Sequence, residues 1–138
     1  MTAIESIKSV LSADAAVSLA YLFGSRAKGE TSNRADWDIA VYLAEDRLAE
    51  NPIWDKFKIE DRLSAALATD AVEVVVLNRL EDPLLGFEII ANSLLLVEKD
   101  ENLRIAFEGS GLARHHDWQY FLDRHLGAER QEAKKNPG

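Results

Sequence analysis

Four short apolar runs, separated by segments of helical pattern, constrain the fold of this chain more than any other feature. The runs read VSLAYLF (17–23), DWDIAVYL (36–43), AVEVVVLN (71–78) and SLLLVE (93–98). Short runs rich in β-branched and aromatic residues are typical of strands. Strands alternating with helices predict an α/β (α+β) domain with a mixed sheet of about four strands. Because the third run is almost wholly apolar, we expect a central strand covered on both faces.

The segments between and after these runs have the residue spacing of helices. They cover residues 4–11, 52–68, 82–90 and 100–133. We expect the last segment to be kinked or broken at Gly109-Ser110-Gly111, because glycine costs roughly 1 kcal/mol per position inside a helix. The chain has 138 residues, which predicts one domain over residues 1–138, with a flexible tail from about residue 128 onward.

Composition excludes several classes of function. The 24 acidic residues outnumber the 16 basic ones and give a net charge of −8, which disfavours direct binding to nucleic acid. The absence of cysteine rules out disulfides, thiolate metal sites and thiol nucleophiles. The start, MTAIESIKSV, is unlike a signal peptide, and the longest apolar run is too short to cross a membrane. We therefore expect a soluble, cytoplasmic protein without a membrane partner.

A glycine turn with basic neighbours follows the first predicted strand. Gly24 permits a positive φ and lets a ligand approach the backbone closely. If a helix follows, Ser25 stands at its N-terminus, where free N–H groups favour anions. Arg26 and Lys28 add positive charge in an otherwise acidic chain. These four residues predict a cradle for the phosphates of a nucleotide.

Three acidic residues on two strands are candidate ligands for Mg²⁺. Asp36 and Asp38 lie two positions apart at the start of the second strand, so their side chains share one face. Magnesium often binds one or two carboxylates together with substrate phosphates, and two such ions can act as a pair. Glu73, in the third strand, is the candidate third carboxylate and catalytic residue. An acid in so apolar a segment is costly unless it is paired or bound to metal.

Each of these features alone has a simpler explanation. A Gly-Ser after a strand is usually only a turn, and Asp-x-Asp in a strand is more often a solvated face. Glu73 could lie at a sheet edge, and Arg26 and Lys28 could be surface charges. The combination of a strand, Gly-Ser, ten residues, Asp-x-Asp and a third acid is what favours a nucleotide site.

The stretch GSRAKGETSNRADWDIAVY (24–42) resembles the Gly-Ser-x10-Asp-x-Asp signature of the nucleotidyltransferase superfamily whose catalytic domain is like that of DNA polymerase beta. VEVVVLNRLEDPLLGFEII (72–90) and LLLVEKDENLRIAFE (94–108) look like later segments of minimal nucleotidyltransferases. The resemblance is greatest to the minimal nucleotidyltransferase (MNT, MntA-type) antitoxins of HEPN–MNT toxin–antitoxin pairs. The sequence departs from the family at Glu73, where aspartate is usual, and at Ala35, where serine is frequent.

The resemblance implies a Mg²⁺-dependent protein adenylyltransferase. Such an antitoxin transfers AMP from ATP to a tyrosine of its HEPN ribonuclease toxin. In that scheme Gly24 and Ser25 hold the triphosphate, Asp36 and Asp38 hold two magnesium ions, and Glu73 completes the metal site or accepts a proton. One domain leaves little room for a second binding site, so we expect another molecule's surface to supply the acceptor.

Two other functions stay open at this stage. The chain could modify a small molecule such as an antibiotic, or it could neutralise a toxin by contact alone with a degraded active site. In the last helix, Leu112, His115, Trp118, Leu122 and Leu126 share one face. We expect that face to pack on its own domain, with toxin binding as the alternative, and we expect the three histidines to be structural or surface residues.

Overall fold

A computed structural model describes residues 1–29 and 35–135 of the chain, with side chains through residue 124. One mixed sheet has the strand order β3-β2-β1-β4. β1 pairs antiparallel with both β2 and β4, whereas β2 and β3 are parallel. The strands are β1 (Val17–Phe23), β2 (Trp37–Leu43), β3 (Val72–Val76) and β4 (Leu94–Glu98), and the α-helices are α1 (Ala3–Ala13), α2 (Ile53–Leu67), α3 (Pro83–Ala91) and α4 (Glu101–Lys135). The predicted fold class is confirmed.

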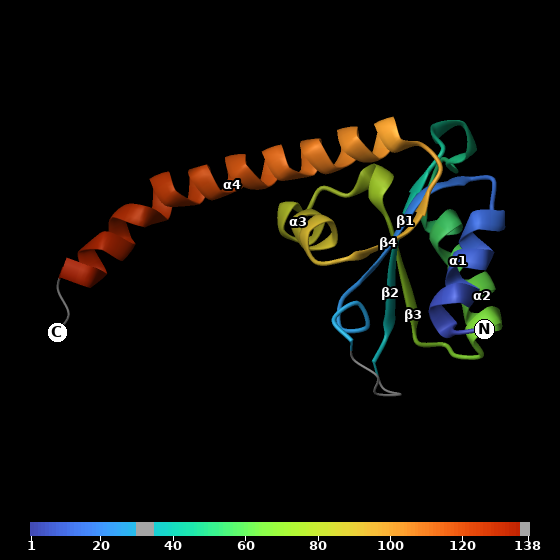
Figure 1. Ribbon diagram of the computed structural model, residues 1–138. Helices are drawn as coiled ribbons and strands as arrows, with labels where there is room; N and C mark the ends of the chain where they lie inside the picture. Colours follow the sequence, from blue (N-terminus) through green and yellow to red (C-terminus); the bar gives the residue numbers. More distant parts are fainter. Residues whose placement is uncertain (30–34, 136–138) are drawn as a thin grey trace.

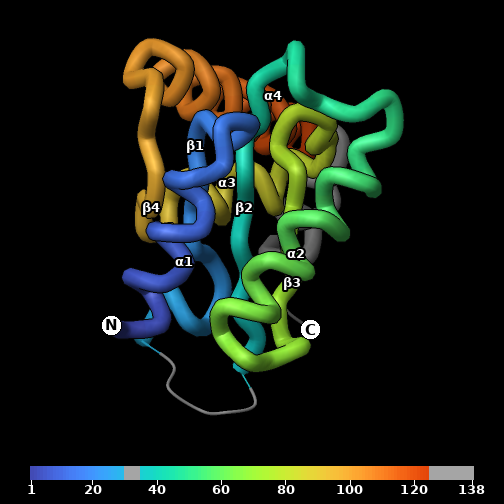
Figure 2. The backbone as a smooth tube through the Cα atoms, turned by 90° about the vertical axis from the view of Figure 1, so that its right-hand side faces the viewer, coloured from blue at the N-terminus to red at the C-terminus, as the bar shows by residue number. Residues whose placement is uncertain are grey.

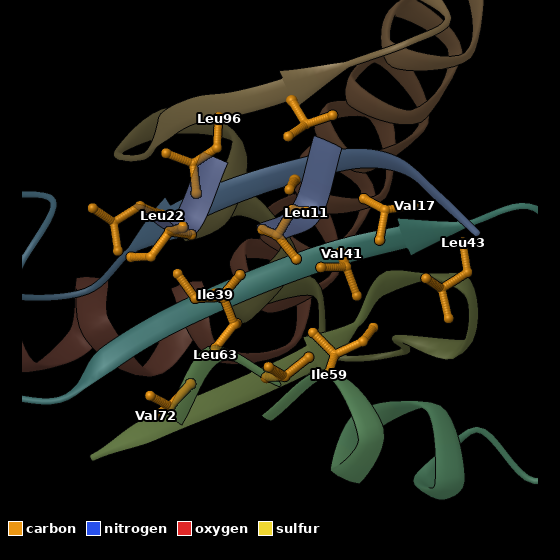
Figure 3. Packing of buried hydrophobic residues seen from close by; sticks show 14 residues of the cluster. Leu11, Val17, Leu22, Ile39, Val41, Leu43, Ile59, Leu63, Val72 and Leu96 are labelled. Atoms are coloured by element: carbon orange, nitrogen blue, oxygen red, sulfur yellow. The ribbon is translucent and has the colours of Figure 1, made fainter. Parts of the chain in front are cut away.

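Helices cover both faces of this sheet (Figures 1 and 2). Alternate residues of β1 and β2 build the two cores, as the period of a strand requires. On one face Leu22, Ile39 and Val41 pack with Leu11 of α1 and Leu63 of α2 (Figure 3). The opposite core is formed mainly by Leu19, Tyr21, Phe23, Ala40, Leu77, Ile89 and Phe107, under α3 and α4.

The helix starts follow from local sequence. The Thr2 hydroxyl accepts a hydrogen bond from the Glu5 N–H, and the Glu5 carboxylate accepts one from Thr2, which makes a complete capping box for α1. The Asp82 carboxylate caps α3 by accepting from the N–H groups of Leu84 and Leu85, with Pro83 in the first helical position.

β3 is an edge strand, so the expectation of a central strand was wrong. Val72 and Val74 are buried against α2, Val75 and Val76 are half-buried, and Glu73 is exposed. The apolar character of β3 comes from cover on its faces by α2 and by the second core, and not from strands on both sides. Glu73 therefore lies at a sheet edge, one of the simpler explanations left open by the sequence.

α4 is continuous through Gly109 and Gly111, against the expectation of a kink or break. A Cβ at Gly111 would overlap the Ile90 side chain, whereas nothing lies within 4 Å of a Cβ at Gly109. Gly111 thus lets α4 approach α3 closely, and that packing offsets the low helix propensity of glycine. The helix extends well past the sheet and continues through Lys135, so the segment expected to be a tail is helical as far as that residue (Figure 1).

The predicted apolar face of α4 packs on the domain only in part. The His115 ring stacks on Phe87 of α3 with centroids 3.8 Å apart, and Trp118 lies next to His115. Leu112, by contrast, is 47% exposed. The side chains of His125 and Leu126 lie outside the described ones. No helix in the described part of the chain could span a bilayer.

Candidate functional site

The end of β1 and the start of β2 bring the glycine turn and the acidic pair together. β1 and β2 are antiparallel neighbours, and Phe23, the residue before Gly24, pairs with Asp38. Asp38 is half-buried, and Asp36, just before β2, is exposed. Gly24, Asp36 and Asp38, which the sequence motif groups together, therefore lie at the same end of the β1–β2 pair.

Gly24 is required at its position for two reasons. Its φ is +73°, in the left-handed region that favours glycine. A Cβ there would also overlap Oδ2 of Asp38. The glycine thus leaves room for the Asp38 carboxylate, and any larger residue would displace that carboxylate from the turn.

The described part of the segment after Gly24 is a series of turns, not the start of a helix. The N–H groups of Ala27, Lys28 and Gly29 donate to the carbonyls three residues earlier, at 3.2, 3.1 and 3.3 Å. Ser25 is exposed on this turn. The premise that Ser25 caps a helix is therefore not met within residues 24–29, and its role in phosphate binding rests on the turn alone.

The two cations predicted for this cradle both have protein partners. The Arg26 guanidinium donates to the Ala35 carbonyl at 3.1 and 3.2 Å and lies 4.2 Å from the centre of the Trp37 ring. This cation–π contact fixes the turn against the start of β2. The Lys28 ammonium, largely exposed, pairs with Glu88 of α3 at 3.4 Å. Arg26 has a clear structural role, whereas Lys28 could exchange its exposed partner for a ligand.

Glu73 lies beside Asp38 in the register of the parallel β2–β3 pair. Its carboxylate accepts a hydrogen bond from Lys56 Nζ at 2.5 Å, so the acid is paired. Lys56 also contacts Glu60, one helical turn later, at 3.0 Å. Sequence reasoning missed Lys56, and the only signal for it was the Lys-x-x-x-Glu spacing on α2.

The electrostatics of the acidic group are unfavourable for the bare protein. Burial raises the pKa of the Asp38 carboxyl, and the negative charges of Asp36 and Glu73 raise it further. Among the described residues neither Asp36 nor Asp38 has a hydrogen-bonded or ionic partner that would offset this repulsion. A perturbed acid of this kind is typical of ligand sites.

The acidic pair fits a divalent cation that also has a substrate as ligand. The described residues contain no group of three His, Cys, Asp or Glu side chains placed to hold a metal ion by themselves. Mg²⁺, however, commonly takes only one or two carboxylates and completes its shell with phosphates and water. Two adjacent carboxylates whose mutual repulsion a cation would relieve meet that requirement.

A cavity of about 520 Å³ lies elsewhere, at the opposite end of β1 and β2. Its lining includes Leu43, Arg47, Lys58 and Arg62, and none of the acids described above. The acidic site is therefore separate from this cavity.

Comparisons with known proteins agree with this geometry. The family model described as polymerase beta, nucleotidyltransferase, matches residues 5–102. A structure of a toxin–antitoxin with AMP-PNP is similar with a TM-score of 0.72 and 21% identity, over 92% of this chain and 98% of the matched chain.

Two further solved structures share the fold at similar identity. For the tri-AMPylated Shewanella oneidensis HEPN toxin in complex with MNT antitoxin, the TM-score is 0.67 at 20% identity, over 93% of this chain and 96% of the matched one. For the toxin–antitoxin MntA-HepT, the TM-score is 0.67 at 19% identity, over 93% of this chain and 97% of the matched one. No curated protein sequence matches the chain.

Proposed function

The chain belongs to the polymerase beta nucleotidyltransferase family, and from this membership we propose that it is an antitoxin that transfers AMP from ATP to a HEPN-family toxin. The observation that carries the proposal is the acidic pair, Asp36 and Asp38, set against the Gly24 turn at one end of the sheet. The similar solved structures include a HEPN toxin that is AMPylated and a complex with an ATP analogue, which supports this choice of partner and substrate.

In this proposal the residues divide into a phosphate side and a metal side. The Gly24-Ser25 turn receives the triphosphate, with Lys28 as an exposed cation beside it and Arg26 holding the turn in place. Asp36 and Asp38 would hold Mg²⁺, which supplies positive charge to the phosphates when bound. Glu73, next to Asp38, would complete the metal site or accept the proton of the acceptor.

The acceptor is a tyrosine hydroxyl of the toxin. Its ordinary pKa of about 10 means that it must lose its proton to attack the α-phosphorus near neutral pH. The new bond joins the tyrosine oxygen to the α-phosphorus, and the bond to the departing pyrophosphate breaks. The single small domain leaves the acceptor to be supplied by the surface of the partner, and the reaction takes place in the cytoplasm, where ATP is available.

The test is to incubate the protein with the product of the neighbouring gene, ATP and Mg²⁺, and to measure the mass of that product. We expect the mass to rise by whole AMP units, and we expect the Asp36→Asn, Asp38→Asn double variant to leave the partner unmodified. A partner that stays unmodified with either Mg²⁺ or Mn²⁺ would contradict adenylyl transfer.

Neutralisation by contact alone is the second candidate, and the pairing of Glu73 with Lys56 favours it because that acid is already engaged. The same double variant discriminates between the two. If it still binds the toxin and still protects cells, occlusion is sufficient and catalysis is dispensable.

A further inference from the structure

Two side chains of α2 cover the open edge of β3. Lys56 Nζ donates to the Val74 carbonyl at 3.1 Å, and the Glu60 carboxylate accepts from the Val74 N–H at 3.0 Å. On an edge strand these two backbone groups would otherwise lack a strand partner. Lys56 and Glu60 also contact each other at 3.0 Å. Lys56 is thus an anchored lysine, whose side chain is only 26% exposed, and not a freely moving surface cation.

The Lys56 ammonium group also contacts Glu73, the third acid of the site. Lys56 Nζ lies 2.5 Å from Oε1 of Glu73, whose side chain is 57% exposed. Glu73 is the direct neighbour of Asp38 across the β2–β3 pair. The positive charge of Lys56 therefore lies beside Glu73, the direct neighbour of Asp38 in the proposed metal site.

We propose that Lys56 is a positioning residue that holds the Glu73 carboxylate in an ion pair and leaves Asp36 and Asp38 as the two carboxylates that bind the divalent cation. The inference rests on the proposed function and narrows it, because it removes Glu73 from the metal ligands. Side-chain length supports it: an aspartate at position 73 would be one methylene shorter and would reach less far toward α2.

Two opposite charges that offset each other have a specific signature in binding experiments. Loss of the lysine charge alone leaves an extra negative charge near the cation and tightens binding. Loss of the glutamate charge alone leaves an extra positive charge and weakens binding. Loss of both returns the local charge to its starting value. For a divalent ion and a unit charge separated by about 6 Å in a water-like medium, Coulomb's law gives about a tenfold change in affinity for each single step.

The experiment is a titration of the nucleotide-free protein with Mn²⁺, followed by the electron paramagnetic resonance signal of the free ion. We expect Lys56→Met to bind Mn²⁺ about tenfold more tightly and Glu73→Gln about tenfold more weakly than the wild type. The double variant should lie within about twofold of the wild type. Lys58→Met, an exposed lysine on the same helix, removes the same charge at a distance from the acids and should change affinity by less than about twofold.

A double variant as weak as Glu73→Gln would identify Glu73 as a metal ligand and overturn the inference, as would unchanged binding in Lys56→Met. Lys56→Gln provides a second variant, because its amide can still donate to the Val74 carbonyl and so preserve the strand edge. If Asp36→Asn binds Mn²⁺ as tightly as the wild type does, the metal site of the proposed function is wrong and the inference fails with it. If binding depends on Asp36 but the pair does not behave as a unit, the proposed function stands and only the inference fails.

Discussion

Two groups of charged side chains lie on the same sheet, one on β1 and β4 and the other on β2 and β3, and they are built in opposite ways. Where α4 packs on β1, the Tyr21 hydroxyl donates to the Glu108 carboxylate at 3.0 Å. Arg104 forms ion pairs with Glu108 at 3.1 Å and with Glu98 at 3.2 Å. At the other group, Asp36 and Asp38 face each other's charge and that of Glu73, and among the described residues only Glu73 has an ionic partner.

The difference separates charges that support the fold from charges that we propose bind a ligand. In the Tyr21 group each charged side chain lies beside an opposite charge, and Tyr21 has a hydrogen-bond partner. In the Asp36–Asp38 group the repulsion persists, because nothing in the described protein neutralises it. Folding stability alone would not favour the second arrangement, and the proposed binding of a cation and a nucleotide would explain it.

The largest expected effect comes from Asp38→Asn, which removes the central charge of the acidic group. Adenylyl transfer should fall on the order of a hundredfold or more, the size found for electrostatic groups at reacting centres. The ligand-free variant should nevertheless melt at a higher temperature near neutral pH. Activity and thermal unfolding of the same preparations test both parts.

The pH dependence of Asp38→Asn has a definite sign. A raised pKa means that folded Asp38 keeps its proton when the unfolded chain has already lost it. Wild-type stability relative to the variant therefore decreases as pH rises from about 4 through the raised pKa of Asp38. A stability difference that is independent of pH would show that Asp38 is not under electrostatic strain.

A smaller effect is expected from Gly24→Ala, compared with Gly29→Ala as its matched control. Both glycines have positive φ, +73° and +92°, so both changes carry a backbone cost of roughly 1–2 kcal/mol. Only the Cβ at position 24 meets Asp38; the space around position 29 is open. Transfer should therefore fall about tenfold more in Gly24→Ala than in Gly29→Ala. Equal activity in the two variants would mean that the position of the Asp38 carboxylate is unimportant.

The smallest effect is expected from Tyr21→Phe, in the Tyr21 group. Loss of one hydrogen bond should lower the free energy of unfolding by about 1 kcal/mol and leave Mn²⁺ binding unchanged. Burial and the neighbouring Glu108 raise the pKa of Tyr21, so the wild type should lose this advantage as pH rises above about 10, where the unfolded tyrosine ionises. Denaturant unfolding at pH 7 and pH 10.5 measures the difference. A change in metal binding would contradict the separation of the two groups.

The sequence was sufficient for the element order, because strand and helix periods are local properties. The spacing of the motif also predicted that Gly24, Asp36 and Asp38 lie together. Gly24 follows β1 and the two acids begin β2, and the two strands are antiparallel neighbours, so the three residues lie at one end of the pair. The sequence could not identify β3 as an edge strand, because cover by α2 makes an edge strand as apolar as a central one. It failed at Gly111 because contact with Ile90, which is distant in sequence, outweighs the local preference of glycine. Lys56 was missed for the same reason: its partners Glu73 and Val74 lie on another element.

The strand order also has a consequence for how the chain folds. β1, β2 and β3, which carry the site, lie within the first 76 residues, whereas β4 pairs with β1 across about seventy residues of intervening chain. Closing so long a loop is slow in comparison with pairing neighbouring strands. We therefore expect the three-strand unit to form early, with β4 and α4 joining it late. During synthesis on the ribosome, the acidic site would be present before the helix that extends from the domain has been made.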